Sequence, residues 1–209
     1  LGVVVNDADI SFGALLLSFL APFKTYNSVV CMLCLLCAMA GLFTLAAMVP
    51  VYLEAVIQLQ TTDMGFVTSA IGFGGFAGQF IWPGLSDKIG RKPAAIGGFI
   101  GATIACYWFA QVDAGVMALF VPLFITSFFC LGNIALITGP IATESAPVGL
   151  VAGTIGMVVG VGEIFGGGGA PMIAGYVAGT SGMGSIMNVA LVGVALGIVA
   201  ALFLKETAP

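Results

Sequence analysis

The chain has 209 residues, of which 60% are hydrophobic and only 7% are charged, and its mean hydropathy is +1.20. A soluble domain carries about 25% charged residues, so this composition excludes a water-soluble globular protein and indicates one surrounded by lipid. The net charge of −4 and the five basic residues exclude a nucleic-acid-binding surface, which needs a basic patch.

The N-terminal residues precede the first long apolar stretch. The chain begins with Leu1 and lacks the basic start of a signal peptide, so we interpret it as a fragment of a longer protein. Ile10 to Phe23 is apolar but too short to cross a bilayer, which favours a segment lying at the membrane surface; the end of a preceding span is the alternative. We predict that residues 1–27 form a cytoplasmic linker.

Long apolar stretches make up the rest of the chain. About 20 residues cross the roughly 30 Å hydrocarbon core as a helix, whereas barrel strands are about half as long and alternate in polarity. From Ser145 to Leu204 only Glu163 is charged, and Gly179-Thr180-Ser181-Gly182 predicts a turn that divides this stretch into two spans. The sequence therefore predicts an all-α integral membrane protein with a six-span domain over residues 28–204 and a tail over 205–209. The predicted spans are about 28–53, 64–85, 93–112, 116–138, 148–178 and 185–204.

The basic residues predict the orientation. With six spans, both termini lie on the same side as the second-to-third and fourth-to-fifth connections. All five basic residues fall on that side, which the positive-inside rule assigns to the cytoplasm. We expect a plasma (inner) membrane protein with both termini cytoplasmic; the basic residues are Lys24, Lys88, Arg91, Lys92 and Lys205.

The connection between the second and third spans carries the most specific motif. It runs Gly84-Leu-Ser-Asp87-Lys88-Ile-Gly90-Arg91-Lys92-Pro93. Gly90 permits a sharp bend, and Asp87 can pair with Lys88 or Arg91 or lie at a helix N-terminus. The run resembles the loop motif of the major facilitator superfamily, although Pro83 stands where the leading glycine of that motif is expected. The matching residues are Ser86, Asp87, Lys88, Gly90, Arg91 and Lys92.

The layout of residues 24–207 agrees with this resemblance, through Glu144-Ser-Ala-Pro147 after the fourth span and Leu204-Lys-Glu-Thr207 after the last. The resemblance implies two three-helix inverted repeats that form the C-terminal half of a transporter. Alternating access would then need a second six-helix half, supplied by an N-terminal segment or by another copy. The resemblance also implies that Asp87 and Arg91 latch helices together and bias the inward–outward exchange.

Glu163 lies in the middle of the fifth predicted span, where an ionisable group is costly and usually functional. At 100° per residue it shares a stripe with Gly156, Gly160, Gly167 and Ala170. We therefore expect it to face packed helices or a cavity, as a proton-coupling or cation-binding carboxylate. A neutral, hydrogen-bonded glutamate that links helices is the alternative.

Glycines at four-residue spacing predict close helix contacts. Gly166 to Gly169, followed by Pro171, predict a break or bend in the fifth helix. The spaced pairs are Gly74 and Gly78, Gly97 and Gly101, Gly156 and Gly160, and Gly193 and Gly197.

A few polar side chains within the spans are candidates for lining a cavity, namely Gln79, Asn133 and Tyr52; amides that bridge helices are the alternative. The C-x₂-C-x₂-C run of Cys31, Cys34 and Cys37 lies in an apolar stretch without the fourth cysteine of an iron–sulfur site. We expect these cysteines to fill apolar space.

We predict no metal site and no cofactor. The chain has no histidine, no phosphate-binding loop and no Gly-x-Ser-x-Gly motif, which excludes the common enzyme classes. We predict half of a secondary active transporter, driven by protons and carrying a metabolite or organic acid in symport. The alternatives are a drug exporter of the same family and a membrane module that does not transport.

Overall fold

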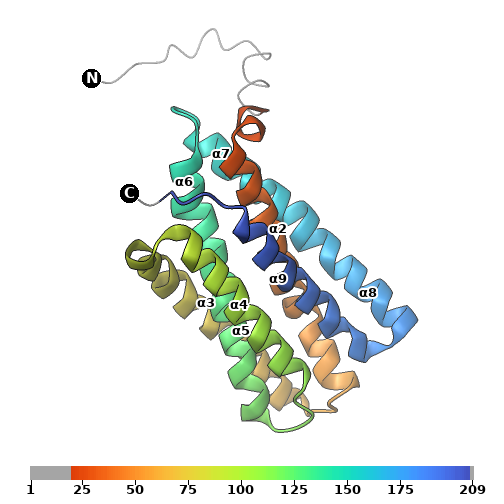
Figure 1. The fold of residues 1–209 in the computed structure, drawn as a ribbon. Coiled ribbons are helices and arrows are strands. Elements are labelled where there is room, and N and C mark those ends of the chain that lie inside the picture. The colour runs from red at the N-terminus through yellow and green to blue at the C-terminus, as the bar shows by residue number, and fades with distance from the viewer. Residues whose placement is uncertain (1–19, 208–209) are drawn as a thin grey trace, which may run out of the picture.

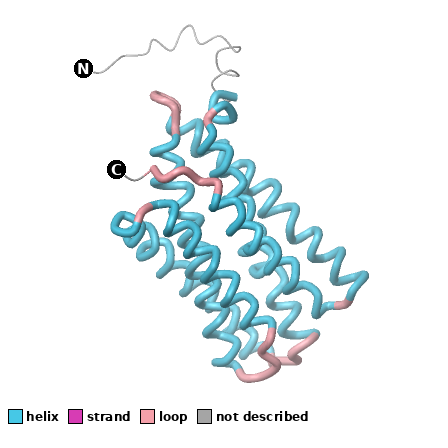
Figure 2. The backbone as a smooth tube through the Cα atoms, in the orientation of Figure 1, coloured by secondary structure: helices cyan, strands magenta, loops and turns pink. Residues whose placement is uncertain are grey.

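The structure is a computed structural model that describes residues 20–207. Within this range every regular element is a helix, and six helical lengths are long and apolar enough to span a membrane (Figure 2). The predicted six-helix architecture is confirmed. The spans are α2 (Tyr26–Ala55), α3 (Thr61–Ile89), α4 (Arg91–Ala110), α5 with η2 and α6 (Val116–Leu136, Ile137–Ile141 and Ala142–Ser145), α7 with η3 and α8 (Val151–Val161, Gly162–Gly169 and Ala170–Ser181), and η4 with α9 (Met183–Ser185 and Ile186–Leu202).

The connections between these helices are short. In lipid each span satisfies its own backbone hydrogen bonds, so irregular backbone is confined to the turns. Gly90, between α3 and α4, has a φ of +95°, and Gly182, after α8, has a φ of +91°. These left-handed values favour glycine. A 3₁₀ turn, η1 (Ala21–Lys24), precedes α2. The predicted surface segment Ile10 to Phe23 lies mostly outside the described residues.

Two helices, α2 and α5, form the centre of the bundle (Figure 1). The second and third spans, α3 and α4, pack mainly on α5, while the fifth and sixth spans pack mainly on α2. Exchanging the first three spans with the last three therefore leaves the contact pattern unchanged. This is the arrangement of two interlocked three-helix repeats, as predicted.

The core contains mostly aliphatic and small side chains from α2, α4, α5 and α9. Cys31, Cys34 and Cys37 are buried on α2 and pack among these apolar neighbours. They fill apolar space, as the sequence predicts for small apolar residues.

Glycines bring α3 and α5 into close contact. A Cβ atom at Gly74 would overlap the Phe124 carbonyl, and one at Gly78 would overlap the Phe128 carbonyl. The two helix backbones can approach this closely only because these glycines have no side chain. Gly193 and Gly197, against α2 and Phe99 of α4, also pack as predicted.

The other two glycine pairs behave differently. Gly101 packs against the ring of Phe129, whereas a Cβ at Gly97 would only reach Trp82 at 3.9 Å. Gly156 and Gly160 have no atom within 4 Å of an added Cβ. The prediction that this pair forms a helix contact within the bundle is therefore wrong.

The fifth span is helical without interruption from Val151 to Ser181, so the predicted break does not occur. Instead, residues Gly162–Gly169 wind as a π-helix, and Pro171 lies in the first turn of α8. A bend without a break stays a prediction. The buried residues of this span recur at every fourth position: Thr154, Val158, Gly162, Gly166, Ala170 and Ala174.

The π-helix explains this regular spacing. In an α-helix a four-residue step overshoots a full turn by about 40°, so a buried stripe with this spacing would rotate away from α2. In a π-helix, whose hydrogen bonds reach from i to i+5, the same step falls short of a full turn. The overshoot in the α-helical parts and the shortfall in the π-helical part offset each other, so the stripe stays against α2. Added Cβ atoms at Gly162 and Gly166 would meet Leu35 and Met39 of that helix.

Candidate functional site: a charged latch and a membrane-embedded glutamate

Arg91 is the centre of a charged cluster at one end of the bundle. It is the first residue of α4 and is 9% exposed. Its Nη2 donates to Glu144 Oε1 of α6 at 3.0 Å, and its Nη1 donates to Asp87 Oδ1 and to Ser86 Oγ of α3. One guanidinium therefore joins the ends of three helices. Of the two partners that the sequence allowed for Asp87, the structure shows Arg91.

The C-terminal tail completes this cluster. Glu206 accepts hydrogen bonds from the backbone N–H groups of Arg91 at 2.8 Å and Lys92 at 3.1 Å. A carboxylate at this position satisfies free N–H groups of the first turn and interacts favourably with the helix dipole. Thr207 Oγ donates to Glu144 Oε2 at 2.5 Å. We call Asp87, Arg91, Glu144, Glu206 and Thr207 the latch.

The rest of the loop motif supports the latch through its backbone. Gly90 ends α3 and turns the chain into α4, so that Arg91 and Asp87 lie at i and i+4 across the turn. The side chain of Lys88 is exposed, and that of Lys92 is partly buried. The Arg91 side chain is 11% exposed and that of Glu144 is 27% exposed, so this pair is costly to break, whereas Asp87 is 61% exposed and its pair with Arg91 contributes less. The latch is therefore suited to holding the helix ends in one arrangement until they separate together.

Glu163 does not pack inside this bundle. Its side chain is exposed on the fifth span, while its neighbours Gly162 and Gly166 face α2. Of the two surroundings that the sequence left open, packing against helices of this bundle is not seen, and a cavity stays a prediction. Gly156 and Gly160 of the same predicted stripe, which precede the π-helix, are likewise unpacked. Glu163 is roughly 18 Å along the helix from Val151, near the middle of a hydrocarbon core of about 30 Å.

Asn133 and Tyr52 are buried within the bundle. Asn133 Oδ1 accepts a hydrogen bond from Trp82 Nε1 at 3.0 Å, and its Nδ2 donates to the Ala95 carbonyl at 3.2 Å. It bridges α3, α4 and α5, which is the alternative that the sequence left open. Tyr52 is 5% exposed and its ring packs 6.1 Å from that of Phe109. Their role in lining a cavity stays a prediction.

The sequence profile of the Major Facilitator Superfamily matches residues 31–209. The chain belongs to this family. This is a family of membrane transporters, which agrees with the prediction that the chain is not an enzyme. No curated protein sequence matches the chain significantly.

Solved structures of transporters share the fold. A mutant of the peptide transporter POT in complex with sulfate superposes with a TM-score of 0.76 at 15% identity, covering 88% of this chain and 40% of that one. The human organic anion transporter MFSD10 (TETRAN) superposes with a TM-score of 0.71 at 18% identity, covering 88% of this chain and 48% of that one. This Major Facilitator Superfamily chain thus spans less than half the length of these transporters.

The face of α3 opposite its glycines is exposed in this family member. Phe73, Phe76 and Phe80 are 65–70% exposed, and the side chain of Gln79 is exposed beside them. Glu163 is exposed on the fifth span, which is the counterpart of α3 in the second repeat. Gln79 was a candidate from the sequence, whereas the aromatic face was not predicted, although the spacing of these phenylalanines opposite Gly74 and Gly78 is visible in the sequence.

Proposed function

We propose that the chain is the C-terminal half of a secondary active transporter that moves a small solute by alternating access in proton symport. The fold and family support a transporter, and the similar structures are about twice as long. A second six-helix half would come from an N-terminal segment or from another copy. The observation that carries the proton coupling is the position of Glu163.

Glu163 is an acid inside a span, far from either end. The other acids in the described residues lie at or near helix ends, within reach of water. A carboxylate facing hydrocarbon at mid-depth costs at least about 2.5–3.5 kcal/mol, so the exposed face around Glu163 requires a protein or aqueous neighbour. Transporters of this kind bind solute and coupling ions near the membrane midplane between their halves. Glu163 therefore carries the proton in this proposal.

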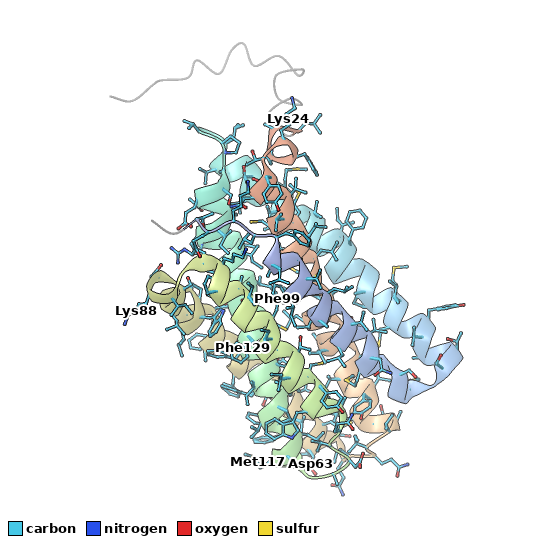
Figure 3. All side chains as sticks on the ribbon, viewed as in Figure 1. Lys24, Asp63, Lys88, Phe99, Met117 and Phe129 are labelled. Carbon is cyan, nitrogen blue, oxygen red and sulfur yellow. The ribbon has the colours of Figure 1, made fainter. Side chains whose placement is uncertain are left out.

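The latch then serves as a gate on the cytoplasmic side. Lys88 of the loop motif and Lys24 lie toward one end of the bundle, while Asp63 and Met117 mark the other end (Figure 3). The positive-inside rule assigns the lysine end to the cytoplasm, in a plasma (inner) membrane. Asp87, Lys88, Gly90, Arg91 and Lys92 form the gating loop, and Gln79 lines the solute path with the aromatic face of α3.

That aromatic face also supports the second candidate, a drug exporter. Exposed rings of Phe73, Phe76 and Phe80 can bind apolar compounds. We place a metabolite or organic acid first among the solute classes, because the midplane carboxylate of Glu163 would couple its transport directly to protons. An anionic solute would need its positive partner in the other half, since the basic side chains of the described residues all lie at the lysine end.

Transport in vesicles tests the proposal. The full protein is reconstituted with a pH-sensitive dye inside, and a panel of organic acids, peptides and drugs is applied with and without a pH gradient. We expect gradient-driven accumulation of one class. Glu163→Gln should abolish accumulation while leaving solute exchange, whereas the control Glu54→Gln, at an exposed helix end, should accumulate normally.

Three outcomes would contradict the proposal. Unchanged accumulation and pH dependence in Glu163→Gln would remove the proton-coupling role. Outward pumping of drugs would favour the exporter. No transport of any compound by the full protein would favour a membrane module without transport activity.

A further inference from the structure

A groove runs between α2 and α9 at the lysine end of the bundle. Its volume is about 490 Å³. Its wall is mostly apolar, and a lysine and a tyrosine lie at its rim. The lining residues include Phe23, Lys24, Tyr26, Leu33, Ala200 and Phe203.

Two positive charges lie near this groove, and contacts hold one of them, Lys205, in place. Lys24 lines the groove, and Lys205 Nζ lies 4.6 Å from the centre of the Tyr26 ring, in a cation–π contact. The backbone of Lys205 exchanges two hydrogen bonds with the Asn27 amide, at 3.0 and 3.1 Å. Tyr26 Oη donates to the Phe203 carbonyl at 2.9 Å. No acidic side chain lines this groove among the described residues.

A second groove lies farther along α2 and α9, toward the middle of the membrane, and η3 and α8 form its other wall. It measures about 450 Å³ and is lined by residues including Leu36, Ala40, Val192 and Leu196. Leu33 and Leu36 are about one turn apart on α2, as are Ala200 and Leu196 on α9. From Tyr26 to Ala40 the seam is roughly 21 Å long, which exceeds the depth of one leaflet, about half of 30 Å.

We infer that this seam binds an anionic phospholipid, with its phosphate between Lys24 and Lys205 and one acyl chain along α2 and α9. Hydrocarbon fits the seam because its walls are apolar and it opens on a membrane-spanning surface. The two lysines select an anionic headgroup over a zwitterionic one through charge complementarity. The lipid site itself does not depend on the proposed function. The orientation proposed above serves only to assign the site to the cytoplasmic leaflet.

Native mass spectrometry of the purified full protein tests this site. The detergent solution contains dioleoyl phosphatidylglycerol, dioleoyl phosphatidylcholine or glycerol phosphate. We expect retention of phosphatidylglycerol only. The double variant Lys24→Gln/Lys205→Gln should lose about fivefold in affinity per lysine, while Lys88→Gln, an exposed lysine of the loop motif, should retain lipid. Ala200→Trp should block the groove, whereas Ile81→Trp, on the exposed surface of α3, should not.

Each alternative occupant gives a distinct result. Equal retention of phosphatidylcholine, or undiminished retention of phosphatidylglycerol in the double lysine variant, would overturn the inference. Binding of glycerol phosphate alone would indicate a phosphate site without lipid. No retained lipid would mean that other protein segments fill the seam. Because no variant here touches Glu163, these results are independent of the transport test.

Discussion

Replacing Gly78 by alanine tests the close contact between α3 and α5. The added methyl group would overlap the Phe128 carbonyl oxygen, a backbone atom that cannot rotate away. The two helices must therefore move apart along the stretch where Gly74 also contacts the Phe124 carbonyl. Overpacking of this kind costs about 1–3 kcal/mol, even though alanine is intrinsically better than glycine in a helix by about 1 kcal/mol.

The matched control is Gly72→Ala. Gly72 lies on the same helix, is exposed, and has no atom within 4 Å of an added Cβ, so this variant should be unchanged or slightly stabilised. For a protein of this size each kcal/mol shifts the melting temperature by roughly 2–4 °C. We expect Gly78→Ala to melt about 2–12 °C below the wild type in detergent, measured by thermal unfolding. Equal melting temperatures for the two variants would refute the packing argument.

Two further predictions concern polar contacts, and the same thermal assay checks both. Arg91→Ala should lower stability by about 1–3 kcal/mol, mainly because it leaves the partly buried Glu144 carboxylate without its cation; the exposed Asp87 contributes less. Arg91→Lys should recover only part of this loss, since lysine cannot form the same forked contacts. A wild-type melting curve for Arg91→Ala would contradict the latch. Asn133→Leu should cost about 1–3 kcal/mol by leaving the partly buried Trp82 N–H without its acceptor, and no loss would show that the bridge contributes nothing.

The sequence predicted the features that depend on local composition. The number of spans follows from the lengths of the apolar stretches. The close helix contacts at Gly74 and Gly78 follow from the four-residue spacing of these glycines. For Asp87 the sequence allowed Lys88, Arg91 or a helix N-terminus, and the structure shows Arg91, four residues away across a short turn. Each of these needs only residues that are near one another in the chain.

The features that the sequence did not predict depend on distant contacts. For Glu163 the sequence left packed helices and a cavity open, because the face that an apolar span turns toward its neighbours is set by contacts with distant helices; Gly156, Gly160 and Glu163 all face away from α2. Glu206 binds the N-terminus of α4 from 115 residues away. Its part in the latch therefore cannot be read from local sequence.

The account rests on six spans that place the lysine end in the cytoplasm, and cysteine labelling of intact cells tests this most directly. The five native cysteines are buried, so an introduced exposed cysteine provides the signal. A membrane-impermeant maleimide should label Thr180→Cys, at the end of the fifth span, on intact cells, and Lys88→Cys only after lysis. Labelling of Lys88→Cys on intact cells, with Thr180→Cys protected until lysis, would contradict the orientation and the proposed cytoplasmic gate.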